Sequence, residues 1–123
     1  MTFDIKQFAK VSKERSDVWG KVSEQGPLTP EYWGNALAGE VGELCNFLKK
    51  LARTRKGMAG AKPEAELKVA IAKEIADVYT YLDLIATEFG IDWPMEVVNK
   101  FNEVSERNGF PHRYSWSEQR AVH

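Results

Sequence analysis

Apolar side chains recur at intervals of three and four residues along most of the chain, a spacing that predicts amphipathic helices. No segment shows the sustained alternation of a β-strand. We therefore predict an all-α, four-helix bundle-like fold in a single domain, residues 1–109, followed by a C-terminal tail, residues 110–123. The four helices are expected at about Phe3 to Val22, Pro30 to Leu51, Glu64 to Phe89, and from a cap at Asp92 to Arg107.

Residues that start and stop helices support these limits. The segment Thr29–Glu31 combines an N-cap, a proline at the first helical position and an acid in the first turn. Gly26–Pro27 should end the preceding helix, and Gly90 suits the position just after a helix. Thr2 is the candidate cap of the first helix.

The helical spacing also selects the side chains that should face the core. In the first helix these are Phe8, Val11, Val18 and Trp19. In the last helix they are Val97, Val98, Phe101 and Val104. The aromatic start of the tail should pack loosely against this chain or a partner.

Composition restricts the function classes. The chain has 123 residues and a net charge of -1, so its overall charge favours neither nucleic acid nor an anionic membrane. No apolar run approaches the roughly 20 residues of a membrane span, and the N-terminus lacks a secretory pattern. The single cysteine, Cys45, fits a reducing compartment and is interpreted as a residue at the core edge. We expect a cytoplasmic protein.

Two acidic pairs interrupt the apolar stripes of neighbouring predicted helices. Glu40 and Glu43 lie three residues apart in the second helix, and Glu74 and Asp77 repeat that spacing in the third. Glu40 and Glu74 fall within the apolar arcs, where an isolated ionised carboxylate is costly. A divalent cation held by oxygen ligands can offset this cost, so we predict that these four acids bind a metal.

The ligand type indicates which metal. Carboxylates without cysteine or histidine favour Mg²⁺, with Mn²⁺ as an alternative, over Zn²⁺. Both histidines, His112 and His123, lie in the tail, which argues against a di-iron site of the Glu-x-x-His type. The competing interpretation is that the acids form salt bridges with lysines such as Lys49, Lys50 and Lys73 or with a partner chain.

Carboxylate-bound Mg²⁺ usually takes further ligands from substrate phosphates, which suggests phosphoryl or nucleotidyl transfer to water. Among the acids, Glu43 at the edge of the stripe is our preferred general base. Trp19, Trp33 and Tyr81 are either core aromatics or walls of a base pocket. The basic stretch at residues 49–62 is either a phosphate-contacting segment or a solvated helix end and loop.

The sequences GEVGE and EIADV, with their flanks ALAGEVGEL and DVYTYL, resemble the signature of MazG-like nucleotide pyrophosphohydrolases. These enzymes belong to the all-α NTP pyrophosphatase superfamily, together with dimeric dUTPases, dCTP pyrophosphatases and phosphoribosyl-ATP pyrophosphohydrolases. The resemblance covers roughly residues 32–107. It implies that Glu40, Glu43, Glu74 and Asp77 bind Mg²⁺ and that the substrate is a nucleoside triphosphate, cleaved to the monophosphate and pyrophosphate.

The resemblance implies further substrate contacts and a partner. Tyr81 matches a substrate-contacting tyrosine of dCTP-pyrophosphatase-like members, and Asn46 and Lys50 match polar positions that meet phosphate. Lys100 and Asn102 match residues of the closing helix that approach the phosphates. Family members assemble as dimers or tetramers, so we expect a homodimer or homotetramer. About 30 residues separate the acidic pairs, slightly more than is usual in the family, and this longer loop leaves the substrate preference open.

The sequence leaves two other functions open. The alternative is a non-catalytic helical module that binds a nucleotide or a protein, in which the acids form salt bridges. Nucleic-acid binding through residues 49–62 is disfavoured by the balanced charge and the lack of a known motif. The sequence leaves the base and sugar preference undetermined.

Overall fold

The structure, a computed structural model, describes residues 1–116, and these residues form four α-helices without a strand. The all-α prediction is confirmed. The helices are α1 (Ile5–Val22), α2 (Pro30–Arg55), α3 (Glu64–Glu88) and α4 (Trp93–Arg107). No helix in the described part of the chain is both long and apolar enough to cross a membrane. His123, a residue of the predicted tail, lies outside the described residues.

Side-chain caps begin three of the helices. The Thr29 hydroxyl accepts a hydrogen bond from the Tyr32 amide, and Asp92 accepts one from the Met95 amide, as their sequence positions predict. The cap predicted at Thr2 is wrong. Asp4 takes that role and accepts from the Gln7 amide at 3.0 Å, because the helix begins at Ile5.

Helix α2 continues past its predicted end at Leu51 to Arg55. The apolar spacing stops at Leu51, but Arg53 and Arg55 are cations in the last turn, where they interact favourably with the helix dipole. The connecting loop therefore shortens to residues 56–63. Gly57, with a φ of 68°, makes the reversal that follows the helix.

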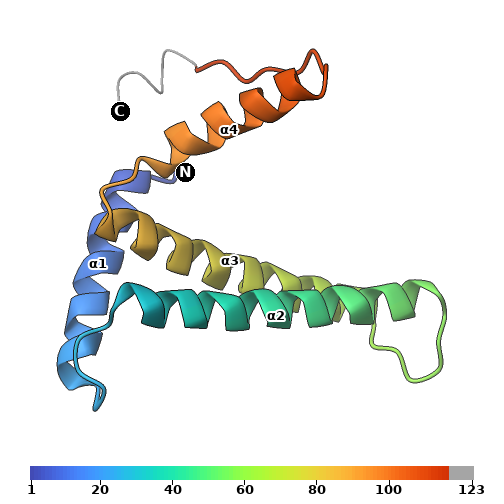
Figure 1. The fold of residues 1–123 in the computed structure, drawn as a ribbon. Helices are drawn as coiled ribbons and strands as arrows, with labels where there is room; N and C mark the ends of the chain where they lie inside the picture. Colours follow the sequence, from blue (N-terminus) through green and yellow to red (C-terminus); the bar gives the residue numbers. More distant parts are fainter. Residues whose placement is uncertain (117–123) are drawn as a thin grey trace. The chain divides into compact units, whose positions relative to one another are not determined.

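Helices α2 and α3 run side by side as an antiparallel hairpin (Figure 1). Helix α1 lies across the end of the hairpin where α2 begins and α3 ends. The Phe8 ring on α1 packs against Tyr79 on α3, with the centroids 5.6 Å apart, so the inward prediction for Phe8 holds. Trp33 and Leu67 are almost fully buried, and they form the hairpin core with Leu84.

Helix α1 buries a face different from the predicted one. Ser12, Ser16 and Gly20 are buried at four-residue spacing, which puts them on one side of the helix. A Cβ atom on Gly20 would lie 3.1 Å from Cα of Pro27, so small residues are what permit this close approach. The predicted inward positions Val11, Val18 and Trp19 are instead 54%, 60% and 57% exposed.

The second compact unit starts at Gly90 and contains α4 and the described part of the tail, residues 110–116. Val98 is buried, whereas Val97 and Phe101, which we predicted to face inward, are more than half exposed. The side-chain amide of Asn102 donates to the Tyr114 carbonyl and accepts from the Tyr114 amide. The tail is therefore hydrogen-bonded to α4 at Tyr114, and its residues 110–115 are exposed. The domain limits predicted above stay predictions.

Candidate functional site

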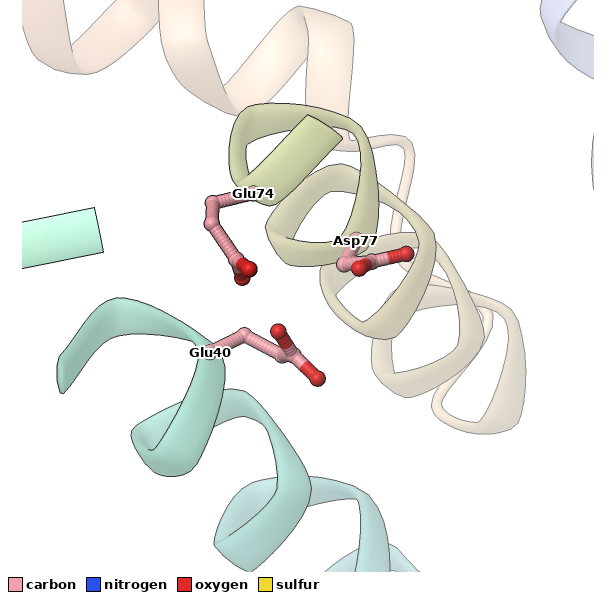
Figure 2. Close-up of side chains that lie close together, drawn as sticks. All are labelled: Glu40, Glu74 and Asp77. Atoms are coloured by element: carbon pink, nitrogen blue, oxygen red, sulfur yellow. The ribbon is translucent and has the colours of Figure 1, made fainter. Parts of the chain in front are cut away.

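Three carboxylates converge between α2 and α3. Glu40 projects from α2, Glu74 projects from α3 toward it, and Asp77 lies one turn further along α3 (Figure 2). One oxygen from each residue lies within 4.8 Å of the other two. The pairing follows from the sequence, because i and i+3 positions share a helix face and an antiparallel hairpin sets the two faces opposite each other.

Like charges at this distance alter the chemistry of Glu74. Two ionised carboxylates have no proton to share, whereas protonated Glu74 can donate a hydrogen bond to Glu40. This hydrogen bond is the largest cause that raises the pKa of Glu74 from 4.5 to about 7. Partial desolvation and the charges of Glu40, Glu43 and Asp77 act in the same direction. Glu74 is thus the acid that resists ionisation in the absence of a cation.

The donor set fits a hard divalent cation. Oxygen Oε2 of Glu74 is shielded from solvent and has no hydrogen-bond partner, although a buried carboxylate oxygen normally has one. The three carboxylate oxygens lie within 4.8 Å of one another, and oxygen is the ligand type that Mg²⁺ prefers, so Glu40, Glu74 and Asp77 would hold such a cation. The three oxygens can therefore serve as ligands of one metal ion.

Salt bridges among the described residues do not explain these acids. Among residues 1–116, no lysine or arginine forms an ion pair with the four predicted ligands, Glu40, Glu43, Glu74 and Asp77. Glu43 itself is exposed and lies outside the group of three, although its charge contributes to the raised pKa of Glu74. Its predicted roles, as fourth ligand or as general base, stay predictions.

A cavity of about 280 Å³ adjoins the carboxylates and shares Asp77 with them. All three helices of the first unit line it: Ser12, Arg15, Ser16 and Trp19 come from α1, Tyr32 and Trp33 from α2, and Asp77, Thr80, Tyr81 and Leu84 from α3, with Leu28 from the connecting loop. Trp33 and Tyr81, two predicted substrate-binding residues, both contribute to this lining. Trp19, the third aromatic considered, lines it as well.

The cavity has a buried side and an exposed side. Trp33 and Leu84 are at most 6% exposed, whereas Asp77 and Arg15 are exposed to solvent. On the buried side, the indole Nε1 of Trp33 and the hydroxyl oxygen of Ser12 have no hydrogen-bond partner. Both atoms are shielded from solvent, so a ligand reaches them only if the surrounding side chains shift. These two atoms leave hydrogen-bonding capacity beside the cavity.

Tyr81 lines the cavity one helical turn after Asp77. Partial burial is the main cause that raises the pKa of Tyr81 above its usual 10, and the charges of Glu40 and Asp77 act in the same direction. Arg15 opposes them and lowers the pKa. The pKa of Tyr81 therefore depends on the charges of the acidic cluster and of Arg15 on α1.

The sequence interpretation missed the contribution of α1. Ser12, Arg15 and Ser16 all line the cavity, but only the large apolar residues of this helix were considered for the interior. The available signal was the run of small residues Ser12, Ser16 and Gly20 at four-residue spacing, which is typical of a face that packs closely against another helix.

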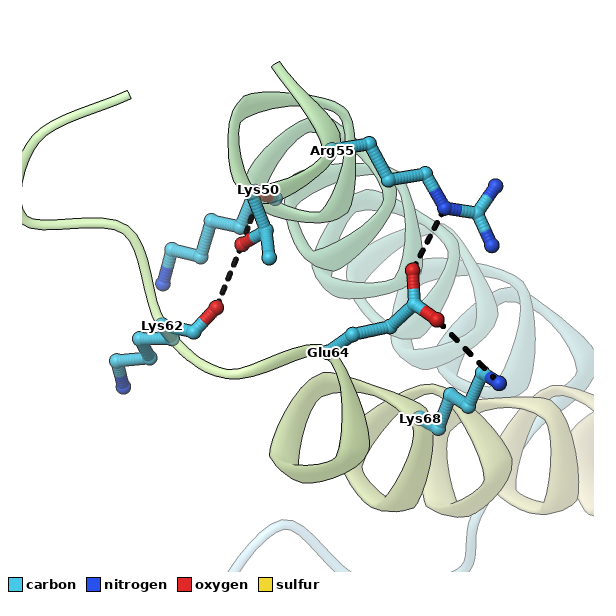
Figure 3. A network of polar contacts seen from close by, with 6 residues as sticks. Lys50, Arg55, Lys62, Glu64 and Lys68 are labelled. Carbon is cyan, nitrogen blue, oxygen red and sulfur yellow. Dashed lines mark hydrogen bonds and ion pairs between the residues drawn. The ribbon is translucent and has the colours of Figure 1, made fainter. Parts of the chain in front are cut away.

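One cation of the basic segment at residues 49–62, Arg55, is paired with the first residue of α3 (Figure 3). Arg55 Nε donates to Glu64 Oε1 at 2.7 Å, and Lys68 lies 3.5 Å from the other oxygen. The Arg55 interaction is the largest cause that holds the pKa of Glu64 below 4.5. The Thr54 hydroxyl lies 2.6 Å from the Lys62 carbonyl oxygen, so the two ends of the loop are joined. The network supports the loop and engages Arg55.

Two of the other predicted phosphate contacts, Asn46 and Lys50, belong to the first unit and are not among the residues that line the cavity. Asn46 is exposed on α2, and the Lys50 ammonium lies 5.3 Å from the centroid of the Phe47 ring. In the second unit, the Lys100 ammonium is 3.4 Å from Glu103, and Asn102 holds the tail as described above. The roles of Asn46, Lys50, Lys100 and Asn102 toward substrate remain predictions.

Part of the chain is similar in sequence to a curated enzyme. The chain is 32% identical over 72 residues to dCTP pyrophosphatase 1 of Mus musculus, a match that covers 58% of this chain. The matched region spans about two fifths, 41%, of that relative's length. No protein-family model matches the chain.

Proposed function

We propose that the protein hydrolyses a (deoxy)nucleoside triphosphate to the nucleoside monophosphate and pyrophosphate, in a reaction that depends on Mg²⁺. The observation that carries the proposal is the junction, at Asp77, of a three-carboxylate cluster with a cavity lined by aromatic residues. A triphosphate needs both features, one for its charged end and one for its base. The partial similarity to dCTP pyrophosphatase 1 supports the same reaction class.

Glu40, Glu74 and Asp77 would hold the cation, with Glu43 as a fourth ligand or a neighbour. Mg²⁺ suits this set, and Mn²⁺ would be the substitute, because both prefer oxygen ligands. When bound, the cation would neutralise phosphate charge and help to orient the reacting groups. The shielded oxygen of Glu74 gains a partner in this arrangement, which fits its unsatisfied state in the structure.

Glu43 is our proposed general base. It lies on the exposed border of the cluster, one turn after Glu40, where a water molecule can approach it. Glu43 takes a proton from the attacking water, whose oxygen forms a new bond to phosphorus. The bond between that phosphorus and the bridging oxygen breaks, and pyrophosphate leaves with the electron pair. Glu74 is a poorer base while it is a ligand, because its lone pairs are engaged.

The nucleoside is proposed to occupy the cavity on α1, α2 and α3. Tyr32, Trp33 and Tyr81 supply aromatic faces on which a base can stack, an interaction that tolerates every base. The indole N–H of Trp33 and the hydroxyl of Ser12 can hydrogen-bond to its edge once the lining side chains move. The rest of the phosphate contacts are assigned, as predicted from the sequence, to Asn46, Lys50, Lys100 and Asn102.

We also propose a homodimer or homotetramer in the cytoplasm, where such an enzyme removes unwanted nucleotides from the precursor pool. Exposed apolar side chains support an assembly, because soluble monomers rarely leave large contiguous apolar surface uncovered. Val11, Val18 and Val22 on α1 are each more than half exposed.

The test is a panel of canonical and modified (d)NTPs, with the products separated after reaction. The proposal predicts monophosphate and pyrophosphate in equal amounts for at least one substrate, and no product after chelation of divalent cations. Release of inorganic phosphate and a diphosphate would reject the reaction class. Binding of a triphosphate without any turnover would favour the non-catalytic module.

A further inference from the structure

Arg15 is the one cationic side chain in the described lining of the cavity. It is exposed, and it forms no hydrogen bond or ion pair with any of residues 1–116. Lys13, two positions earlier on the same helix, is in contrast paired with Asp17. The guanidinium of Arg15 is therefore free to bind a ligand in the cavity.

The position of Arg15 in the cavity lining indicates which part of a bound nucleotide it would contact. Asp77, which belongs to the carboxylate cluster, also lines the exposed side, and Tyr81 lies one helical turn beyond Asp77. Arg15 acts electrostatically on the Tyr81 hydroxyl, which places its charge near this edge of the acidic cluster. The buried side, with Trp33 and Ser12, lies away from solvent.

A nucleotide that occupies both the cavity and the carboxylate cluster must place one of its groups at Asp77, where the two meet. With the base on the buried side and the outer phosphates at the cation site, the α-phosphoryl group comes between them, beside Asp77 and Arg15. We infer that Arg15 is a catalytic residue that binds the α-phosphoryl oxygens and stabilises the negative charge that develops there. The inference rests on the proposed function.

The chemistry of arginine suits this role. A guanidinium presents parallel N–H donors that match two phosphate oxygens and stays charged throughout the pH range of the protein. Donors aimed at developing charge commonly contribute about 10²- to 10³-fold to turnover. An exposed arginine that only filled space, or that only balanced Asp77, would contribute far less.

The experiment compares Arg15→Gln and Arg15→Lys with the matched control Lys13→Gln. Each variant is assayed with the triphosphate that the wild-type protein hydrolyses fastest, and its affinity for the corresponding monophosphate and free nucleoside is measured. We expect Arg15→Gln to lower kcat/KM by about 100-fold or more. It should weaken monophosphate binding by about tenfold or more and leave nucleoside binding unchanged. Arg15→Lys keeps the positive charge but lacks the planar guanidinium, so its kcat/KM and monophosphate affinity should lie between those of Arg15→Gln and the wild type. Lys13→Gln should match the wild type in both quantities.

Two outcomes overturn the inference. Equal losses of monophosphate and nucleoside affinity would assign Arg15 to the base or sugar, and wild-type kinetics in Arg15→Gln would leave it without a role. Since Arg15 is exposed and unpaired, unfolding temperatures should not change in its variants. A wild-type protein that hydrolyses no triphosphate fails the proposed function itself. If only the inference about Arg15 is wrong, the wild-type protein still hydrolyses a triphosphate, and this turnover distinguishes the two failures.

Discussion

Glu40 and Glu74 face each other across the α2–α3 hairpin, with an oxygen of each less than 4.8 Å from one of the other. Hydrogen bonding between them and their mutual charge are among the causes that raise the pKa of Glu74 to about 7. The fold brings these two acids together at a cost in free energy, because each loses water while facing a like charge. A bound cation removes the repulsion between the two acids, so the free energy that folding spends on bringing them together favours cation binding.

Neutral substitutions in the cluster should abolish most of the activity. Glu74→Gln and Asp77→Asn keep the side-chain size but remove a ligand charge, so we expect turnover to fall by at least about 100-fold, since even altered partners of metal ligands cost about 10- to 100-fold. Pyrophosphate release at saturating Mg²⁺ measures this. Glu66→Gln is the control, because Glu66 is an exposed acid on the same helix outside the cluster. Equal losses in the control would point to a general charge effect.

Glu43→Gln should separate catalysis from metal binding. If Glu43 is the general base, kcat should fall by about 10²- to 10⁴-fold, while Mg²⁺ affinity measured by titration calorimetry changes little. In Glu74→Gln both quantities should fall. A Glu43 variant that loses Mg²⁺ affinity as strongly as Glu74→Gln would make Glu43 a ligand and contradict its assignment as the base.

The stability of the cation-free protein should depend on pH through Glu74. Its pKa in the folded protein, about 7, exceeds the ordinary value of 4.5, so the folded state binds more protons between these limits. Protonated Glu74 makes its full contribution to the free energy of unfolding below about pH 4.5, and this contribution is lost as the pH rises through about 7. Thermal unfolding in chelator should therefore show a larger decrease in stability over this range for the wild type than for Glu74→Gln.

Added Mg²⁺ should reverse the part of the pH dependence that comes from Glu74, since a cation binds the ionised form and competes with the proton. Identical pH profiles for the wild type and Glu74→Gln in chelator would contradict the link between this carboxyl group and stability.

The docking of α1 should be sensitive to a single methyl group. Gly20→Ala places a Cβ 3.1 Å from Cα of Pro27 and 3.2 Å from the Leu28 amide nitrogen, so backbone must shift. Gly34→Ala is the matched control in α2, because a Cβ at this position meets nothing within 4 Å. This substitution should stabilise the folded protein by about 0.4–1 kcal/mol. We expect Gly20→Ala to be less stable than Gly34→Ala by about 1–3 kcal/mol in urea denaturation. A Gly20 variant as stable as the Gly34 variant would show that α1 adjusts freely.

Helical periodicity was sufficient to predict the hairpin and the acids that meet in it. Glu40 and Glu74 could be recognised because each interrupts an apolar stripe, and the three-residue spacing places Asp77 on the same face as Glu74. The cap at Thr29 and the helix start at Glu64 depend on local residues alone, so they were predictable as well.

The orientation of α1 was not predictable from hydrophobicity. Its buried face consists of Ser12, Ser16 and Gly20, which a hydrophobic pattern ranks as polar or neutral, while Val18 points to solvent. Close packing selects small side chains here, and that preference depends on which helices approach. The same orientation of α1 forms one wall of the cavity and places Arg15 in its lining, so neither could be predicted from hydrophobicity. Likewise, the use of Asn102 to hold Tyr114 depends on the path of the tail.

The most direct test of the central claim measures Mg²⁺ binding and pyrophosphate release in the same preparations of the wild type and Glu74→Gln. We expect the wild type to bind Mg²⁺ and to release pyrophosphate from at least one (d)NTP. We expect Glu74→Gln to lose both properties while its helices remain folded by circular dichroism. Undiminished pyrophosphate release in Glu74→Gln, or release by the wild type in excess chelator, would contradict the central claim.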